Sequence, residues 1–334
     1  MPYPTLFTSN RSLRHRQGAL DAAPSELTVT MLEHPSRDEL LLQLAQVEYL
    51  ISERVGVIDS EMIRVAPNLK LILRLGSMTY DIDIEAAKAA GIIICTWPDV
   101  GAISVAEHTV MQILALNKRL REVQAAALEA SSQWGESRRT DENTFAYNWS
   151  HQRQINRIWG QTIGILGFGE IGSELVRRLK GWGCTLLYNK RSRLPESVET
   201  ELGLIYVNED SLCQQSDVLV NLLPYSSETV NKINAAWLAT MKQGALVVSC
   251  GSGGTIDEQA LADAIQSGHL AGAAMDSYSV EPLQADNPLV RLAQEGANVL
   301  LTPHTAAGNG RSRAEEYTNI LRHLRGEPIL YRVV

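Results

Sequence analysis

The sequence predicts an α/β protein with two doubly wound parallel sheets, and three observations indicate this class. The chain has 334 residues, enough for two domains, and 45% of them are hydrophobic, so each domain can bury a core. Short apolar runs alternate with helical patterns over residues 27–100 and again from Thr162. The first run of the second series leads directly into a glycine-rich turn, GFGEIG.

Charge and cysteine usage exclude several other classes. Thirty Lys and Arg face 38 Asp and Glu, and the resulting net charge of −8 argues against nucleic acid as a partner. No stretch approaches the ~18 uninterrupted apolar residues of a membrane helix, and the start has no apolar signal core, so we expect a cytoplasmic protein with no membrane partner. The four cysteines form no CxxC pair and are expected to be reduced thiols that hold no metal.

The first series supplies four strands and the helices between them. The strands are the continuous apolar runs LTVTM, VEYLIS, LKLILRL and GIIIC, as expected for parallel strands covered on both faces. Helical patterns begin near Ser36, Asp59 and Asp83; the two aspartates are candidate N-caps, and Gly91 stands where a helix C′ glycine belongs. No element is predicted before residue 27.

The middle of the chain predicts one long helix followed by an irregular segment. Residues 104–130 contain no Gly or Pro and place apolar residues at helical spacing. Residues 131–158 are polar with scattered aromatics, and an excursion of that length is often functional or faces a partner. Beyond Gly308, one more helix puts Tyr317, Ile320, Leu321 and Leu324 on one face.

The second series supplies seven short strands and the sharpest motif. The strands are TIGILG, CTLLY, LIYV, DVLVNLL, ALVVSC, LAGAAM and NVLLTP. In GFGEIG, Gly167 permits a tight turn, Gly169 lets a pyrophosphate approach the backbone, and Gly172 lets helix and strand pack closely. Glu170 and Ile171 open the helix, whose N-terminal N–H groups favour phosphate. The motif predicts dinucleotide binding; the alternative is a purely structural glycine turn.

The second of these strands ends in a basic segment, Lys190, Arg191, Ser192 and Arg193. An NAD site usually carries a carboxylate here for the ribose hydroxyls, and none is present. The arginines could instead pair with a 2′-phosphate and Ser192 could donate to it, so we expect NADP to be preferred over NAD. The alternative is a solvated basic loop.

A histidine and two carboxylates stand near the end of the series. His304 directly follows the strand NVLLTP, and Asp276 and Glu281 lie in MDSYSVEP. A histidine held by a carboxylate is suited to protonating the oxygen of a carbonyl that receives a hydride. Taken alone, this histidine favours a structural interpretation. The other six histidines have no comparable setting.

Several segments together resemble the D-2-hydroxyacid dehydrogenase family, the NAD(P)-dependent reductases of glyoxylate, hydroxypyruvate and related 2-keto acids. The matching segments are SVAEH at 104–108, GFGEIG, MKQG at 241–244, GGTIDEQAL at 253–261, AGAAMD with Glu281 and Pro282, and TPH at 302–304. The resemblance implies a Rossmann-type cofactor domain over 101–307, inserted into a flavodoxin-like substrate domain of residues 1–100 and 308–334. It also implies a homodimer.

The resemblance assigns roles to individual residues. It implies that His304 is the acid/base, that Glu281 orients it, and that Asp276 lies near the nicotinamide. It places Pro224, Thr229, Cys250 and Gly251 along the cofactor cleft.

Two positions depart from the family pattern. The family's catalytic arginine falls on Ser252 in SCGSGG, and the loss of such a charged contact typically costs about 3 kcal/mol of transition-state stabilisation. The substrate loop LGSMTYDID keeps Gly76 and Ser77 but has Met78 at the second glycine. Arg74 could supply the missing cation, or it could be a strand residue whose head reaches solvent.

The leading interpretation is a reductase that uses NADPH and a small 2-keto acid. One alternative is a dinucleotide-binding regulatory protein with little or no catalysis, which Ser252 and Met78 favour. Another is a reductase of a carbonyl compound without a carboxylate, for which the arginine would be dispensable.

Overall fold

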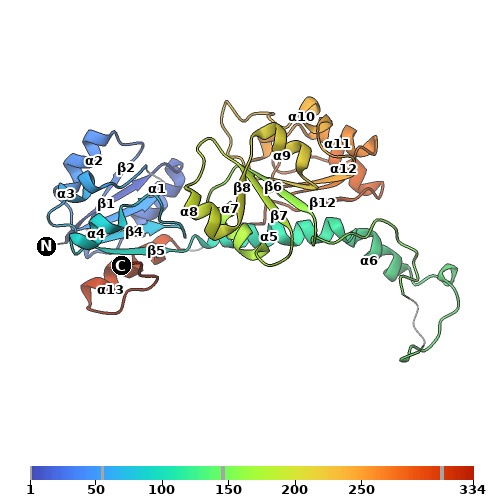
Figure 1. Ribbon diagram of the computed structural model, residues 1–334, viewed down its shortest axis with the longest axis horizontal. Helices are drawn as coiled ribbons and strands as arrows, with labels where there is room; N and C mark the ends of the chain where they lie inside the picture. Colours follow the sequence, from blue (N-terminus) through green and yellow to red (C-terminus); the bar gives the residue numbers. More distant parts are fainter. Residues whose placement is uncertain (1, 54–55, 144–146, 309–311) are drawn as a thin grey trace. The chain divides into compact units, whose positions relative to one another are not determined.

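The computed structural model describes residues 2–53, 56–143, 147–308 and 312–334. The chain divides into two compact units (Figure 1). Unit 1 comprises Met1–Gly101 and Asn309–Val334, and unit 2 comprises Ala102–Gly308. Each boundary falls one residue from that of the expected domains.

Unit 1 is built on a five-stranded parallel sheet in the order β2-β1-β3-β4-β5. The strands are β1 (Tyr3–Ser9), β2 (Leu27–Leu32), β3 (Tyr49–Glu53), β4 (Leu71–Leu75) and β5 (Ile93–Trp97). One face packs on α2 (Arg37–Leu44), α3 (Ser60–Arg64) and α4 (Ile84–Ala89), and the other on α1 (Leu13–Asp21), η3 (Arg313–Tyr317) and α13 (Thr318–Leu324). Asp59 and Asp83 cap their helices as predicted, and Gly91 has the positive φ of a C′ glycine.

β1, which was not predicted from the sequence, lies inside this sheet between β2 and β3. Its residues pair with β2 on one side and with β3 on the other, and Leu6 and Phe7 are fully buried. The segment YPTLFTS has only two large aliphatic or aromatic residues in succession, flanked by threonines, so it lacks the continuous apolar run of its neighbours.

Unit 2 is built on a seven-stranded parallel sheet in the order β12-β11-β10-β9-β6-β7-β8. The strands are β6 (Thr162–Leu166), β7 (Thr185–Asn189), β8 (Leu204–Tyr206), β9 (Val218–Asn221), β10 (Ala245–Ser249), β11 (Leu270–Met275) and β12 (Val299–Leu301). One face packs on α9 (Glu209–Gln215), α10 (Ala235–Ala239), α11 (Glu258–Gln266) and α12 (Pro288–Gln294). The other packs on α5 (Val100–Asn117), α7 (Glu170–Leu179) and α8 (Glu196–Leu202). The predicted α/β class with two doubly wound parallel sheets is therefore confirmed.

The helix predicted over residues 104–130 is in fact two helices, so that prediction is wrong. α5 ends at Asn117 and α6 (Leu120–Glu129) begins after Arg119, whose φ of 49° is left-handed. The Arg119 side chain donates to Glu122 at 2.6 Å and to Gln154 at 2.9 Å. With no Gly or Pro at the break, the sequence offers no local signal for it. α5 contributes to the core of unit 2, whereas α6 buries none of its residues.

The segment after α6 is irregular, as predicted. Its only regular element among the described residues is η1 (Ser132–Trp134), and residues 144–146 lie outside them. The rings of Trp134 and Trp149 lie 5.9 Å apart and connect its two halves.

Two further findings concern the whole chain. Within the described ranges, no helix combines the length and apolar character needed to cross a bilayer. All four cysteines are free of disulfide bonds, in agreement with the expected reduced thiols.

Candidate active site

The predicted cofactor and catalytic residues of unit 2 gather at one edge of its sheet. In a parallel sheet all carboxyl ends lie at the same edge, and ligands bind where the strand order reverses. Here that point lies between β6 and β9, which are neighbours although β7 and β8 separate them in sequence. The loops after β6, β7, β9, β10, β11 and β12, together with the first turn of α7, hold the candidate residues of this unit.

The three glycines after β6 differ in the space around them. Gly167 has a φ of +85°, and a Cβ added to it would lie 2.9 Å from the Leu222 carbonyl carbon at the end of β9. A Cβ on Gly172 would lie 2.9 Å from the Phe168 ring. A Cβ on Gly169 would meet no atom within 4 Å, and Gly169 is the N-cap of α7 without a capping side chain. The space beside Gly169 at the start of α7 is therefore open, as binding of a pyrophosphate there would require.

The basic segment after β7 contains one arginine that is already paired. Arg193 donates from Nε and Nη2 to the two carboxylate oxygens of Glu199 in α8, at 2.8 and 2.7 Å. The Tyr188 hydroxyl donates to the same carboxylate, and the Arg193 guanidinium lies 5.6 Å from the Tyr206 ring centre. Arg191 is different: its side chain is 91% exposed, with a single weak ion pair to Glu228 at 3.8 Å.

His304 and Glu281 meet in the loops after β12 and β11. Nδ1 of His304 lies 2.7 Å from Oε2 of Glu281, and Oε1 accepts from the backbone N–H of Tyr278 at 3.0 Å. Because an ionised carboxylate only accepts, the proton of this pair lies on Nδ1, and Nε2 is left at the outer end of the ring. The His304 side chain is 61% exposed, so Nε2 can reach a ligand.

Asp276 holds the loop that presents His304. Its Oδ1 accepts from the Thr302 hydroxyl at 2.6 Å and from the Thr305 backbone N–H at 3.0 Å, and its Oδ2 accepts from the Ala306 N–H at 2.9 Å. These three bonds enclose His304, whose φ of 53° is left-handed. A buried carboxylate thus stabilises a backbone conformation that a histidine rarely adopts.

The sequence analysis missed two residues of α5 that support this loop. Nε2 of His108 lies 3.0 Å from Thr302 Oγ1 and 3.6 Å from Asp276 Oδ1. Nε2 of Gln112 donates to the same hydroxyl at 3.3 Å. Residues four apart lie on one helix face, so the spacing of His108 and Gln112 was the available signal. From the sequence, His108 had no setting comparable to that of His304, and the structure places it in a helix beside Asp276.

Ser252 begins the short helix η2 (Gly253–Thr255) after β10. Its backbone N–H donates to the Leu223 carbonyl at 2.9 Å, and its carbonyl accepts from the Thr255 hydroxyl at 2.6 Å. Among the described residues its own hydroxyl makes no hydrogen bond. The next residue, Gly253, packs so tightly that a Cβ would lie 1.9 Å from the Tyr278 carbonyl oxygen. The backbone is fixed, and Ser252 offers only a small neutral group.

The remaining predicted residues of unit 2 lie at the same edge in tight local contacts. The Cys250 thiol donates to the Gln112 side chain at 3.3 Å, and burial raises its pKa to about 12. A Cβ on Gly251 would lie 2.8 Å from the Leu223 backbone. The Thr229 hydroxyl donates to the Pro224 carbonyl at 2.7 Å and closes the turn after β9. Through these contacts, each residue helps to form the wall of the candidate cofactor site.

The predicted substrate loop lies at the carboxyl edge of unit 1. Gly76 follows β4, has a φ of 117°, and donates to the Trp97 carbonyl at 2.8 Å, while Met78 is buried. Arg74 is buried too. It donates to the Asp81 carboxylate at 3.2–3.3 Å and to the Leu75 carbonyl at 2.6 Å, and Ser77 is also engaged in a contact. Arg74 therefore has structural partners inside unit 1.

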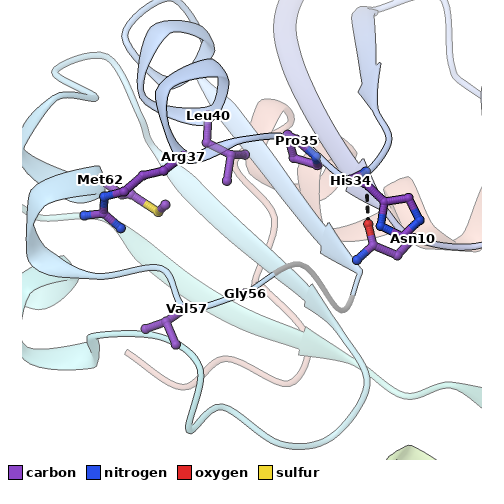
Figure 2. A pocket seen from close by; sticks show the side chains of 8 residues that line it. All are labelled: Asn10, His34, Pro35, Arg37, Leu40, Gly56, Val57 and Met62. Carbon is purple, nitrogen blue, oxygen red and sulfur yellow. Dashed lines mark hydrogen bonds between the residues drawn. The ribbon is translucent and has the colours of Figure 1, made fainter. Parts of the chain in front are cut away.

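Unit 1 also contains a cavity of about 400 Å³, shown in Figure 2. It is lined by Asn10, His34, Pro35, Arg37, Leu40, Gly56, Val57 and Met62. The Asn10 side chain accepts from the His34 backbone N–H at 3.1 Å, and Arg37 donates to Asp59 at 2.8 Å and to Glu61. None of the predicted site residues lines this cavity.

Comparison with known proteins agrees with a nicotinamide dinucleotide fold. The family model described as D-isomer specific 2-hydroxyacid dehydrogenase, NAD binding domain, matches residues 110–306, more than half of the chain. The chain belongs to the family of D-isomer-specific 2-hydroxyacid dehydrogenases, which confirms the resemblance.

Individual relatives cover most of the chain. It is 33% identical over 301 residues to a glyoxylate reductase of Thermococcus onnurineus, with 90% of this chain and 85% of the relative covered. It is 31% identical over 297 residues to a D-3-phosphoglycerate dehydrogenase of Archaeoglobus fulgidus, with 86% of this chain but only 52% of the relative covered. The chain thus spans about half the length of the phosphoglycerate dehydrogenases that it matches. A solved structure from Pyrococcus horikoshii is similar with a TM-score of 0.59 and 26% identity, covering all of this chain and 95% of that one.

Proposed function

We propose that this protein is a reductase that transfers a hydride from NADPH to a small 2-keto acid, or catalyses the reverse oxidation of a 2-hydroxy acid. The observation that carries the proposal is the pair of His304 and Glu281 at the same sheet edge as a glycine loop that fits a dinucleotide. The similarity to a glyoxylate reductase over nine-tenths of the chain supports the substrate class.

Glu281, His304 and Asp276 have distinct roles in this reaction. A bound nicotinamide dinucleotide supplies the hydride. Glu281 fixes the proton on Nδ1 of His304 and stabilises the ring when it is cationic, so Nε2 can give a proton to the carbonyl oxygen. Asp276 keeps His304 in place through the backbone of the loop around it. Because its orientation is already fixed, His304 needs no conformational rearrangement before it can transfer a proton.

The cofactor preference for NADPH rests on the segment after β7. Arg191 has an exposed guanidinium, Ser192 an exposed hydroxyl, and neither is held by the fold as Arg193 is. A 2′-phosphate carries the opposite charge to Arg191, and the carboxylate that would repel it, Glu199, is already paired with Arg193.

The direct test follows oxidation of NADPH and of NADH with glyoxylate, hydroxypyruvate, pyruvate and bulkier 2-keto acids. We expect turnover with at least one of them and a kcat/KM about tenfold higher with NADPH. Equal or faster turnover with NADH would reject the cofactor preference. No turnover with any 2-keto acid would reject the substrate class.

Ser252 favours a second candidate, a reductase of carbonyl compounds that have no carboxylate. A neutral hydroxyl stands where the family has a guanidinium, so the contact that usually recognises the acid group is missing there. Adding simple ketones and aldehydes to the same panel separates the two candidates. NADPH binding without turnover on any of these compounds would favour a regulatory protein.

We also propose that the protein forms a homodimer through α6. This helix buries no residue within its own chain, and Leu128 is 76% exposed on it. An amphipathic helix left uncovered is typical of an interface. Sedimentation analysis should give twice the mass of one chain for the native protein, and Leu128→Glu should shift it toward the monomer. A native protein that sediments as a monomer at all concentrations would exclude this.

A location in the cytoplasm is the last part of the proposal. Four unpaired cysteines are usual in a reducing compartment. Fractionation of cells that express the protein should recover it with cytoplasmic markers, and recovery with an oxidising compartment would contradict the proposal.

A further inference from the structure

A cluster of charged side chains lies at the carboxyl edge of the unit 1 sheet, where the strand order reverses between β1 and β3. Ser9 ends β1 and donates from its hydroxyl to the Glu53 carboxylate at 2.5 Å. Glu53 ends β3 and is almost fully buried. Arg11 follows β1 and donates from Nε to Glu53 at 2.8 Å and from Nη2 to Asp99 at 3.0 Å.

The two carboxylates that Arg11 contacts belong to segments on either side of β4 in the sheet order. Glu53 belongs to β3, Asp99 stands two residues beyond β5, and β4 lies between these strands. Because neighbouring strands are ~4.8 Å apart, β3 and β5 are separated by about 10 Å, a span that one guanidinium and two carboxylates can bridge. β4 leads directly into Gly76, which is hydrogen-bonded to Trp97 at the end of β5.

Among Arg11, Arg74 and Arg313, the arginines that the structure describes at this edge, Arg11 has a nitrogen that can bind a ligand. Its Nη1 makes no hydrogen bond to any described residue, and its side chain is 29% exposed. Arg313 also contacts Glu53, and all three of its side-chain nitrogens donate hydrogen bonds. Their acceptors are Glu316, Glu53 and the His15 carbonyl. Arg74 is buried and held by Asp81.

We propose that Arg11 binds the carboxylate of the substrate at this edge of unit 1. This inference rests on the proposed function. Glu53 and Asp99 hold two nitrogens of Arg11 and fix the plane of its guanidinium, so little side-chain freedom is lost when a carboxylate binds to Nη1. Gly76 and Ser77 directly follow β4, the strand that lies between β3 and β5.

The charges around Arg11 determine how strong such a contact can be. Glu53 is shared by Arg11 and Arg313, whereas Asp99 opposes an incoming anion. Charge-assisted hydrogen bonds of this kind usually change affinity about ten- to a hundredfold. We therefore expect a loss at the lower end of this range when Arg11 is replaced.

The test compares Arg11→Gln and Arg11→Lys with Arg37→Gln as the matched control. Arg37 is another arginine of unit 1 that pairs with two carboxylates, Asp59 and Glu61. The first measurement is KM for glyoxylate. The second is calorimetric binding of oxamate, an unreactive carboxylate analogue of a 2-keto acid, to the complex of the protein with NADPH.

We expect Arg11→Gln to raise KM and the oxamate Kd by about tenfold, with Arg11→Lys intermediate, while the NADPH Kd and the Arg37→Gln protein stay unchanged. Arg11→Gln leaves Ser9 and Arg313 on Glu53, so the buried carboxylate keeps partners and the fold should persist. Oxamate affinity within twofold of wild type in Arg11→Gln, or no oxamate binding to wild type, would overturn the inference. A wild type that turns over no 2-keto acid, yet loses oxamate affinity on Arg11→Gln, would reject the proposed reaction and support the binding site.

Discussion

Nδ1 of His304 and Oε2 of Glu281 lie 2.7 Å apart, and the second oxygen of that carboxylate accepts from the backbone N–H of Tyr278. The carboxylate is thus anchored to the loop after β11 while it orients a ring on the loop after β12. Two loops from neighbouring strands thus form one hydrogen-bonded unit, in which Glu281 orients the His304 ring.

The first prediction concerns this unit. His304→Ala should lower kcat about 10²- to 10⁴-fold, the usual contribution of a positioned general acid, and should leave the NADPH Kd nearly unchanged. Glu281→Gln keeps a hydrogen-bond acceptor but loses the negative charge that stabilises a cationic ring, so a smaller loss of about tenfold is expected. Steady-state kinetics with a 2-keto acid and fluorescence titration with NADPH measure both. Residual activity of His304→Ala above one-tenth of wild type would reject the acid/base role.

The second prediction separates two roles for Asp276. If it acts by holding the loop, Asp276→Asn should lower kcat by about tenfold and speed hydrogen exchange of the Thr305 and Ala306 amides, because an amide side chain cannot accept from all three present donors. Thr302→Ala removes one donor and should give a weaker effect of the same kind. Unchanged exchange together with a weaker NADPH affinity would assign Asp276 to the nicotinamide instead.

The third prediction uses two glycines of one motif as each other's control. Gly169→Val should leave the melting temperature within about 2 °C of wild type, because its φ of −133° suits any residue and its side chain would extend into open space. The same side chain should raise the NADPH Kd at least tenfold by filling the pyrophosphate position. Gly167→Ala should destabilise the fold by about 1–3 kcal/mol, since its φ is +85° and its Cβ would strike the β9 backbone. Thermal melts and cofactor titrations measure both, and a Gly169→Val protein with normal NADPH affinity would refute the cofactor site.

The sequence predicted those features that depend on local pattern. Continuous apolar runs identified every strand except β1, and GFGEIG, His304 and Glu281 were recognised from their place after such runs. Contacts between segments that lie far apart in the sequence could not be predicted. The pairing of Arg193 with Glu199 depends on how α8 packs beside β7, and the contact of His108 with Asp276 depends on α5 lying at the ends of β11 and β12. No spacing rule in the sequence predicts either of these two contacts.

Arg11 illustrates the same limit. It precedes the first predicted element, and its importance follows only from the sheet order that puts β4 between the strands of its two partners. From the sequence, the candidate for the missing cation was therefore Arg74, which stands just before the substrate loop. The structure shows that Arg74 is buried and bonded to Asp81.

The fourth prediction concerns acid stability. Burial alone would raise the pKa of Glu53, but Arg11, the Ser9 hydroxyl and Arg313 outweigh it and hold the pKa below its ordinary value. A carboxyl group with a depressed pKa binds protons less tightly in the folded state, so its stabilisation is full above pH ~4.5 and is lost as the pH falls through the depressed pKa. Glu53→Gln should thus lower the free energy of unfolding by about 3 kcal/mol at pH 7, and by progressively less below pH ~4.5. Urea unfolding of both proteins from pH 3 to 7 measures the difference, and a difference independent of pH would contradict the assignment.

The last prediction asks whether Ser252 still occupies an arginine position in function. Its hydroxyl makes no hydrogen bond to the described residues, so Ser252→Arg removes no interaction seen within them. In the Arg11→Gln background the new guanidinium should raise kcat/KM for glyoxylate about tenfold or more, because the carboxylate would otherwise have no cationic partner. In the wild-type background the gain should be several-fold smaller, since Arg11 already supplies one. Equal gains in kcat/KM in both backgrounds would show that the two arginines act independently. No gain in either background, with NADPH still bound, would show that the loop after β10 no longer faces the substrate as it does in the family.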